Sequence, residues 1–280
     1  VVSACSYEAR KYGVHSAMPI SQAYRLCRNG VYLSPRMDRY QEISRDIMRL
    51  FDDFTPDVRQ LSIDEAVLDM TGTERLLGPP EESARRIKQH VRDGYRLSIS
   101  VGIAPNRYLA KLASEFGKPD GLYRVFPGEE EAFLDELEMS DLWGLGSKML
   151  ERLQELNINT IPELRRHDEG LLKSLLGNAA GSYLYRIVRG LEPSGFRRDP
   201  KSRSISSEIT FEHDTRDKET VHRVLLELSH QVMFRMLDEG YQSSTVQIKV
   251  RYSDFSTTTA QRKLGHRLLS AEELYSISTD

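Results

Sequence analysis

Two adjacent carboxylates interrupt an otherwise apolar, strand-like run between residues 58 and 70. Asp64 and Glu65 lie at the centre of this run. In a straight strand, neighbouring side chains point to opposite faces, so one of the two carboxylates would be buried without a partner. A tight turn at Asp64 and Glu65 avoids this cost, because both side chains then lie at the tip of a hairpin. The run therefore predicts a β-hairpin with two carboxylates at its tip.

Carboxylates this close together repel each other unless a cation lies between them. Their hard oxygen atoms suit Mg²⁺, so a magnesium site is one interpretation and an ordinary charged turn is the other. Cys5 and Cys27 have no CxxC or other metal-ligand spacing, and the histidines form no HxxxH or HExxH pair. We therefore expect both cysteines to be reduced and any metal to bind oxygen ligands.

Length and composition predict more than one domain. A chain of 280 residues with 39% hydrophobic residues can bury a sizeable core, and domains commonly hold roughly 100–200 residues. The longest apolar runs, such as residues 97–104, are much shorter than the roughly 20 residues of a membrane-spanning helix, and no charged-then-apolar leader opens the chain. We expect a cytoplasmic protein with no membrane partner.

The charge changes sign along the chain. The net charge of −3 argues against a general nucleic-acid-binding protein, since phosphate contacts need Lys and Arg. However, residues 1–36 contain five Lys and Arg against one Glu, whereas residues 126–192 contain seven against thirteen acidic residues. This distribution favours several modules over a single one.

Hydrophobic spacing and breaker residues predict alternating strands and helices in the first half, which is typical of an α/β or α+β sheet domain. The expected elements are a helix from Ser34-Pro35 to about Phe54, a helix that starts at Pro79-Pro80, a half-buried strand at 97–103, a helix at 106–116 and a short strand at 121–126.

The second half is predicted to be helical from residue 129 to residue 191, and residues 192–201 have the composition of a linker between domains. The elements expected after it are a strand at 204–211, a helix at 218–237, strands at 245–252 and 257–264, and a helix that starts at Ser270.

Three further segments are suited to binding phosphate. Tyr7 and Arg10 are three residues apart, so they share a face if helical, and the Arg fork and Tyr hydroxyl suit phosphate oxygens. Lys118 follows the glycine that ends the predicted helix 106–116. The Gly-x-Gly turn at 144–146 can present backbone N–H groups to a phosphate. Considered one at a time, the three segments have ordinary structural interpretations as well. These are a basic turn, a lysine that interacts with the dipole at a helix end, and a connector between helices.

Taken together, these segments occur in the order and spacing of one family. The chain resembles the Y-family translesion DNA polymerases, nearest to the DNA polymerase IV type, along nearly its whole length. The stretches that carry the resemblance are Ser6 to Gly13 with Ser16-Ala17-Met18-Pro19, Ser62 to Glu65, Ser100 to Arg107, Lys118-Pro119-Asp120-Gly121 and Gly144-Leu145-Gly146.

The resemblance implies a multidomain α+β right-hand polymerase with a mixed β-sheet palm, small fingers, a helical thumb with a helix-hairpin-helix, and an α/β little-finger domain. Its domains would be the fingers at 1–36, the palm at 37–125, the thumb at 126–192, a linker at 193–201 and the little finger at 202–280.

The resemblance also implies a reaction, which is template-directed nucleotidyl transfer from a dNTP to a primer 3′-hydroxyl. Asp64 and Glu65 would be catalytic residues that bind two Mg²⁺ ions, and Tyr7, Arg10 and Lys118 would bind the triphosphate. The partners would be primer-template DNA and dNTP.

Other residues would contact the DNA or the nascent base pair. Ser3 and Ala17, with Met18 beside them, would cover the nascent base pair, where small side chains enforce shape weakly. Low fidelity and translesion synthesis in DNA damage tolerance and repair would follow. Gly144 and Gly146 would contact the duplex backbone, and Trp143 between helix and turn replaces a Pro that the family often has.

The last domain is expected to grip duplex backbone without reading sequence. Lys249 and Arg251 alternate along one predicted strand and so share a face. Further basic residues are expected near them: Lys201, Arg203, Arg262, Lys263 and Arg267.

The family opens with a strand that carries a further metal-binding Asp and ends with a strand and a sliding-clamp peptide. We therefore expect a chain truncated at both ends that lacks one catalytic Asp, with a clamp as partner of the complete protein only. Ala4 stands where the family has Thr or Ser.

Two other functions remain open at this point. A non-catalytic DNA-binding module would use only the helix-hairpin-helix and the last domain. A nucleotide cyclase on a similar sheet would leave both of those parts unexplained. Should Asp64 and Glu65 not form the metal site, Asp69 is the next carboxylate to consider.

Overall fold

The computed structural model describes residues 1–193 and 204–279, and the chain divides into two compact units, Val1–Arg198 and Asp199–Asp280. The predicted linker, residues 193–201, falls at this division, and all of it except residue 193 lies outside the described residues. Lys201 and Arg203 lie outside them too. Each unit has a hydrophobic core of its own.

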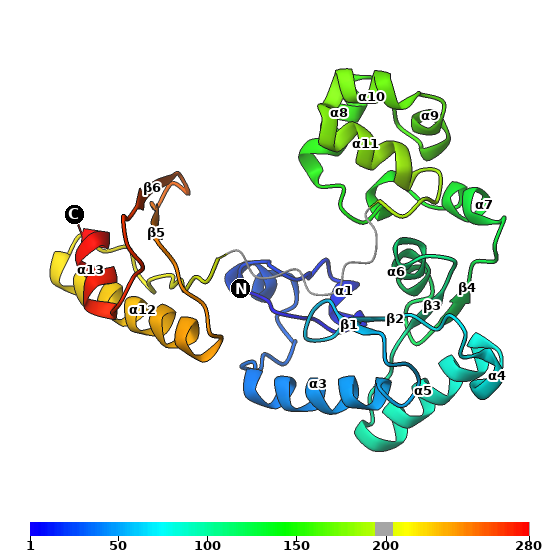
Figure 1. Ribbon diagram of the computed structural model, residues 1–280, viewed down its shortest axis with the longest axis horizontal. Coiled ribbons are helices and arrows are strands. Elements are labelled where there is room, and N and C mark those ends of the chain that lie inside the picture. Colours follow the sequence, from blue (N-terminus) through cyan, green and yellow to red (C-terminus); the bar gives the residue numbers. More distant parts are fainter. Residues whose placement is uncertain (194–203, 280) are drawn as a thin grey trace. The chain divides into compact units, whose positions relative to one another are not determined.

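The first unit opens with two short helices, α1 (Tyr7–Arg10) and α2 (Ile20–Leu26), around a small core (Figure 1). The Val2 N–H donates to the Met18 carbonyl at 2.8 Å, and the Ala17 N–H donates to the Val2 carbonyl at 2.9 Å. These bonds hold the start of the chain beside the segment that leads into α2. The buried residues of this core are Val2, Val14, Met18 and Ala23.

The next part of the unit combines a β-hairpin, a pair of parallel strands and packed helices. Its elements are α3 (Met37–Phe51), β1 (Val58–Gln60), β2 (Ala66–Leu68), α4 (Glu74–Leu77), α5 (Pro80–Tyr95), β3 (Val101–Ile103), α6 (Arg107–Phe116) and β4 (Leu122–Arg124). β1 and β2 are antiparallel, with Val58 opposite Leu68, whereas β3 and β4 are parallel. Helices α3 and α5 lie on one side of the strands and α6 on the other (Figure 1). This confirms the predicted α+β arrangement.

Three predicted boundaries in this part are wrong by a few residues. Helix α3 begins at Met37 and not at Ser34-Pro35, and it ends at Phe51 and not near Phe54. Proline disfavours the helical conformation in the residue before it, which keeps position 34 out of the helix. The strand predicted for residues 97–103 is paired only from Val101, because β4 offers a partner over three residues.

The rest of the first unit is helical, as predicted. Its helices are α7 (Glu130–Asp135), the 3₁₀ helix η1 (Met139–Asp141), α8 (Ser147–Glu155), α9 (Ile161–Arg165), α10 (Glu169–Leu176) and α11 (Asn178–Ile187). Their core does not stop at the predicted palm–thumb boundary. Tyr108, Leu109 and Leu112 of α6 are at most 2% exposed and belong to the same buried cluster. Helix α6 is therefore shared between the strands and the helical part.

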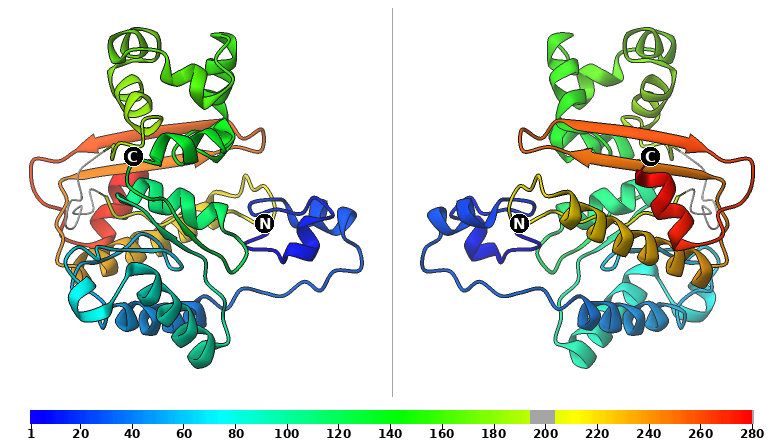
Figure 2. Two further views of the ribbon diagram at one scale, coloured as in Figure 1. Left: turned by 90° about the vertical axis from the view of Figure 1, so that its right-hand side faces the viewer. Right: turned by 90° about the vertical axis from the view of Figure 1, so that its left-hand side faces the viewer.

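The second unit packs two helices against one face of an antiparallel strand pair (Figure 2). Its elements are α12 (Lys218–Asp238), β5 (Thr245–Arg251), β6 (Thr257–Lys263) and α13 (Ala271–Thr279). The strand predicted for residues 204–211 is wrong, because this segment bonds to α12 through side chains. The Ser207 hydroxyl donates to Gln231 Oε1 at 2.6 Å, and Arg235 Nη1 donates to the Ser206 carbonyl at 2.9 Å.

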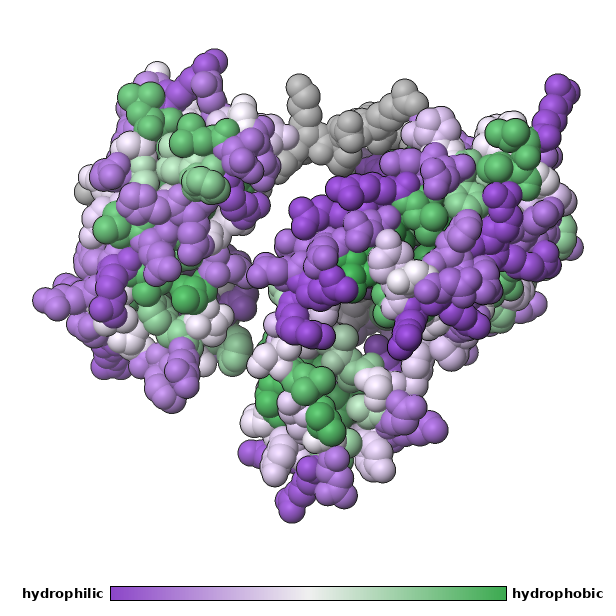
Figure 3. Space-filling view, turned by 90° about the horizontal axis from the view of Figure 1, so that it is seen from below, coloured by the Kyte–Doolittle hydropathy of each residue, from purple (hydrophilic) through white to green (hydrophobic). Residues whose placement is uncertain are grey.

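The surface carries no extended apolar face in the view of Figure 3, where hydrophobic residues lie in separate patches among hydrophilic ones. Across residues 1–193 and 204–279, no helix combines the length and the hydrophobicity that crossing a membrane requires.

Candidate active site and nucleic-acid interface

The acidic hairpin has the geometry predicted from the sequence. The N–H groups of Leu61 and Ser62 both donate to the Glu65 carbonyl, at 2.8 and 3.3 Å, and close a tight turn between β1 and β2. Inside the turn, the Ser62 hydroxyl donates to Asp64 Oδ1 at 2.6 Å. Asp64 is exposed, and Glu65 is half-buried. Both carboxylates therefore lie at the tip, where burial does not force them apart.

The Glu65 carboxylate is held by a lysine from α6. Lys111 Nζ donates to Glu65 Oε1 at 2.7 Å, and the Lys111 side chain is only 14% exposed. The donor set at the tip fits Mg²⁺ in kind, since it offers hard carboxylate oxygens with solvent access at Asp64. The number of carboxylates at the tip fits a magnesium site only in part. Within residues 1–193 and 204–279, no cluster of three or more His, Cys, Asp or Glu side chains is placed to hold a metal.

Asp69 lies at the opposite end of the same hairpin. Its N–H donates to the Asp57 carbonyl at 3.0 Å, and its Oδ1 accepts from the Thr71 N–H at 3.0 Å. Hydrogen bonds from the Thr71 side chain and backbone hold the pKa of the Asp69 carboxyl below its ordinary value. Asp69 therefore caps a turn away from the hairpin tip, and the structure gives no support for it as a replacement metal ligand.

Tyr7 and Arg10 share a face of α1, as their spacing predicts. The guanidinium carbon of Arg10 lies 5.9 Å from the centre of the Tyr7 ring, and both side chains are exposed. The Ser6 hydroxyl caps this helix by accepting from the Ala9 N–H at 3.3 Å. The pair forms an exposed combination of a guanidinium and a phenol hydroxyl.

Only two of the three residues predicted at the nascent base pair are exposed. Ser3 and Ala17 are exposed, and Ala17 has a positive φ of 67°. Met18 is 3% exposed and belongs to the core under these residues. Its side chain therefore supports this surface from below and does not form part of it, which corrects the expectation that it contacts a ligand directly.

Lys118 lies just after the C-terminus of α6, beyond the cap residue Gly117. Its Nζ contacts Glu115 Oε2 at 2.7 Å, and Glu115 Oε1 lies 2.5 Å from Lys111 Nζ. The predicted metal carboxylate Glu65 and the predicted triphosphate residue Lys118 are thus joined through two residues that sequence reasoning missed. The spacing of Lys111 and Glu115, four residues apart on α6, could have indicated the contact between them.

Lys88 of α5 holds the turn that follows Lys118. Its Nζ donates to Asp120 Oδ1 at 2.6 Å, to the Asp120 carbonyl at 2.9 Å and to the Gly121 carbonyl at 3.3 Å. Arg92 also donates to Asp120. Two cations from α5 therefore fix this turn, and no local sequence pattern predicts them because the partners are far apart in the chain.

The turn at 144–146 leads directly into α8, as predicted. Gly144 has a φ of 90°, and a Cβ there would collide with the Tyr183 hydroxyl, which donates to the Trp143 carbonyl at 2.5 Å. Gly146 is the cap residue of α8 and has no side chain to bind the first N–H groups of the helix. N–H groups at a helix N-terminus that no side chain caps can bind an anion.

The second unit exposes a basic strand face. Lys249 lies opposite Thr259, Arg251 opposite Thr257 and Thr245 opposite Lys263, so the three basic residues share one face. We call it the strand face; its residues are Thr245, Gln247, Lys249, Arg251, Thr257, Thr259, Gln261 and Lys263, all exposed and none acidic.

Two residues predicted to join this cluster lie elsewhere. Arg262 is opposite Val246, which is 6% exposed, so Arg262 is on the other face of the strand pair. Adjacent residues of a strand point to opposite faces, which is why Arg262 and Lys263 separate. Arg267 lies beyond the end of β6 and donates to Gln242.

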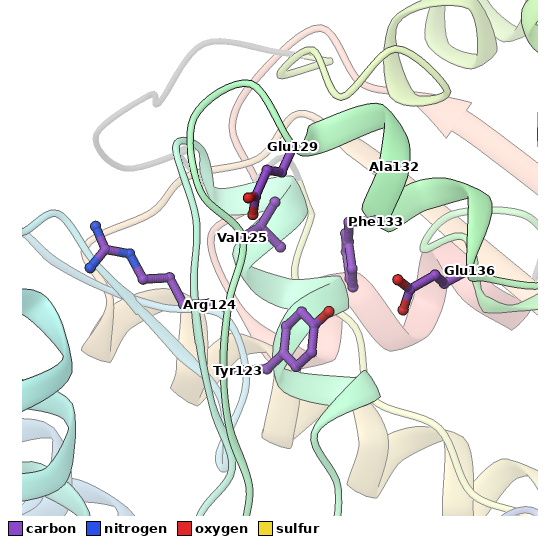
Figure 4. A pocket seen from close by; sticks show the side chains of 7 residues that line it. All are labelled: Tyr123, Arg124, Val125, Glu129, Ala132, Phe133 and Glu136. Atoms are coloured by element: carbon purple, nitrogen blue, oxygen red, sulfur yellow. The ribbon is translucent and has the colours of Figure 1, made fainter.

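A shallow pocket lies between β4 and α7, away from the hairpin tip (Figure 4). Tyr123 and Phe133 face each other in it with ring centres 5.4 Å apart, and Arg124 points away. Burial, followed by the charges of Glu136 and Glu129, raises the pKa of the Tyr123 hydroxyl. Two carboxylates in its lining make this pocket unsuited to a phosphate-bearing ligand.

Three protein-family descriptions match the chain. The impB/mucB/samB family matches residues 1–115, the DNA polymerase-iota thumb domain matches residues 140–192, and the impB/mucB/samB family C-terminal domain matches residues 202–280. Matches in this order cover most of both units.

Curated relatives give the same result. The chain is 48% identical over 261 residues to DNA polymerase IV of Treponema denticola, covering 93% of this chain and 66% of the relative. DNA polymerase IV of Desulfatibacillum aliphaticivorans is 39% identical, with 92% and 65% covered. DNA polymerase IV of Listeria monocytogenes is 36% identical over 276 residues, with 98% and 77% covered. The chain thus spans about two thirds of the length of the first two relatives.

Solved structures show the same fold. The Y-family DNA polymerase chimera Dbh-Dpo4(243-245)-Dbh has a TM-score of 0.85 and 28% identity over 97% of this chain and 78% of its own. DinB from Sulfolobus solfataricus has a TM-score of 0.62 and 27% identity over 98% and 79%. The chain therefore belongs to the Y-family DNA polymerases, in the DNA polymerase IV (DinB) branch.

Proposed function

We propose that the protein is a DNA-directed DNA polymerase that carries out low-fidelity, translesion synthesis. The observation that carries this proposal is the hairpin tip with Asp64 and Glu65, joined by ion pairs through α6 to Lys118 just beyond the end of that helix. Carboxylates suited to divalent cations and a lysine suited to phosphate thus lie on neighbouring elements. The family to which the chain belongs supports the same activity, since the curated relatives named above are all DNA polymerase IV.

Each residue group has a separate task in this proposal. Asp64 and Glu65 would hold two Mg²⁺ ions, which when bound activate the primer 3′-hydroxyl and neutralise triphosphate charge. Lys118 would bind phosphate oxygens as a point charge, whereas Arg10 would bind them with its planar fork and Tyr7 with its hydroxyl.

The remaining groups would position the nascent pair and the DNA. Ser3 and Ala17 expose small side chains that can cover a nascent base pair without enforcing its shape. The N–H groups after Gly146 and the basic residues of the strand face, Lys249 and Arg251, would bind duplex phosphates. Since the relatives are bacterial proteins and bacterial DNA lies in the cytoplasm, we propose that location.

The test is primer extension by the full-length protein on undamaged and lesion-bearing templates, with Mg²⁺ and with EDTA, beside DNA binding by fluorescence anisotropy. We expect Mg²⁺-dependent incorporation and DNA binding that persists in EDTA. Absence of incorporation with intact DNA binding would overturn the proposal.

A non-catalytic DNA-binding module is the second candidate. It is favoured by one observation, that the described residues contain no group of three or more metal-binding side chains. A divalent-cation titration separates the two candidates, because a pure binding module needs no Mg²⁺ for its output.

A further inference from the structure

Four side chains of alternating charge form a continuous row that runs from the hairpin tip to the end of α6. Glu65 Oε1 lies 2.7 Å from Lys111 Nζ, Lys111 Nζ lies 2.5 Å from Glu115 Oε1, and Glu115 Oε2 lies 2.7 Å from Lys118 Nζ. We call Glu65, Lys111, Glu115 and Lys118 the ion-pair row. Each inner member has two partners of opposite charge.

Lys111 differs from the other three members in accessibility. Its side chain is 14% exposed, whereas Glu65 is 37%, Glu115 is 44% and Lys118 is 46% exposed. A largely buried ammonium group must be paired, so Lys111 cannot leave both carboxylates at once. The outer members can exchange their row partner for a ligand from solvent. The row is therefore fixed at Lys111 and open at its two ends.

Charge on the inner members is well supported. Burial acts to lower the pKa of Lys111, but the hydrogen bonds that Lys111 donates to Glu115 and Glu65 outweigh it and leave that pKa raised. Burial acts to raise the pKa of Glu115, but hydrogen bonds from Lys111 and Lys118 outweigh it and leave that pKa lowered. Both groups are thus ionised at neutral pH.

Helix α6 also fixes where the row lies. Tyr108, Leu109 and Leu112 are buried in the core shared with the helical part of the unit, so the helix cannot rotate about its axis without breaking that core. Lys111 and Glu115 are therefore held at a constant position relative to the turn that carries Lys118.

We propose that Lys111 and Glu115 are positioning residues that couple nucleotide binding to the availability of Glu65. When a triphosphate draws Lys118 away from Glu115, the Glu115 carboxylate has Lys111 as its only row partner. Lys111 is then shared less with Glu65, and the Glu65 carboxylate becomes available to a divalent cation. This inference rests on the proposed function, because it takes a nucleoside triphosphate as the ligand of Lys118.

The coupling has a sign that a purely structural role does not predict. Glu115 competes with the triphosphate for Lys118, so its removal should tighten nucleotide binding in the absence of metal. Its removal also leaves Lys111 paired with Glu65 alone, so added divalent cation should then help nucleotide binding less than it does in the unaltered protein.

The experiment measures binding of a fluorescent dATP analogue in EDTA and in Ca²⁺, which supports binding without turnover. The variant is Glu115→Gln. The matched control is Glu169→Gln, which removes another i,i+4 partner of a lysine, Lys173, at 2.8 Å on α10. We expect Glu115→Gln to bind the nucleotide about 2–5-fold tighter in EDTA, the range expected for a partly exposed ion pair, and to gain less from Ca²⁺. The control should match the unaltered protein.

A double-mutant cycle keeps the test independent of folding effects. In a Lys118→Ala background, Glu115→Gln should no longer change nucleotide affinity in EDTA. An unchanged or weaker affinity of Glu115→Gln, or the same gain in the Lys118→Ala background, would overturn the coupling alone. Failure of the unaltered protein to bind nucleotide even with Ca²⁺ would overturn the proposed function, and the coupling with it.

Discussion

The ion-pair row of the first unit and the strand face of the second unit both carry basic side chains, but these side chains differ in exposure and in how closely they are paired. In the row, Lys111 is 14% exposed and contacts two carboxylates within 2.7 Å. On the strand face, Lys249 is 49% exposed and its contact with Glu208 is 3.7 Å long. Close pairing fixes a charge in place for chemistry, whereas an open face leaves charges available to a polyanion.

The largest expected effect tests whether primer extension requires the two carboxylates at the hairpin tip. Replacing Asp64 by Asn, or Glu65 by Gln, in the full-length protein should lower the rate of primer extension at least roughly 100-fold, because both carboxylates would bind the metal ions in the proposed reaction. DNA affinity should stay nearly unchanged, since the proposed duplex contacts are the N–H groups after Gly146 and the strand face. The control is Asp69→Asn at the opposite end of the hairpin. Extension above about a tenth of the original rate would remove Asp64 and Glu65 from the proposed active site.

The next effect tests the rigidity that the row requires. Leu109 of α6 is fully buried, so Leu109→Ala should lower the free energy of unfolding by about 2–5 kcal/mol. Val250 of β5 is 42% exposed, and Val250→Ala should cost less than about 1 kcal/mol. Urea denaturation measures both. Equal costs would show that α6 is no better anchored than the strand pair.

A smaller effect concerns the strand face. Replacing Lys249 and Arg251 together by Ala should lower the slope of log affinity for duplex DNA against log salt by roughly one unit per lost phosphate contact. The control removes two exposed basic residues of α12, Lys218 and Arg223, and should leave the slope unchanged. If the two double variants behave alike, the strand face is merely solvated.

The smallest effect is a pH dependence of the stabilisation by the ion pair between Glu81 and Arg124. The hydrogen bond from Arg124 lowers the pKa of Glu81, and the two side chains are 28% and 24% exposed. Because the folded pKa is depressed, the stabilisation is present above the unfolded value of about 4.3 and is lost as pH falls through the folded pKa. Glu81→Gln should therefore lower the free energy of unfolding by up to about 1 kcal/mol at neutral pH, and by progressively less as pH falls through the folded pKa of Glu81. A cost that persists at low pH would assign the effect to packing.

The parts of the fold and site that the sequence predicts are those set by local rules. Adjacent carboxylates in an apolar run forced the turn at Asp64 and Glu65, and the glycine turn at 144–146 predicted the start of α8. Alternation along β5 placed Lys249 and Arg251 on one face. Each of these follows from backbone geometry within a few residues.

The parts that the sequence does not predict depend on distant contacts. Lys111 meets Glu65 across 46 positions, and Lys88 meets Asp120 across 32. The segment 204–211 looks like a strand but bonds to α12 through side chains, so tertiary contacts override its local preference. Met18 was expected at a ligand because of its neighbours, yet its side chain points into a core.

In helix α6, the number of residues between the contacting side chains matters as much as which residues they are. Each residue turns a helix by about 100°, so inserting a single residue between Leu112 and Glu115 would rotate the Glu115 carboxylate away from Lys111 while Tyr108, Leu109 and Leu112 stayed in the core. A substitution along this helix changes the contacts of one side chain, whereas a change of register moves every side chain beyond it. Engineering of this protein should therefore place insertions in its loops and leave the spacing within α6 intact.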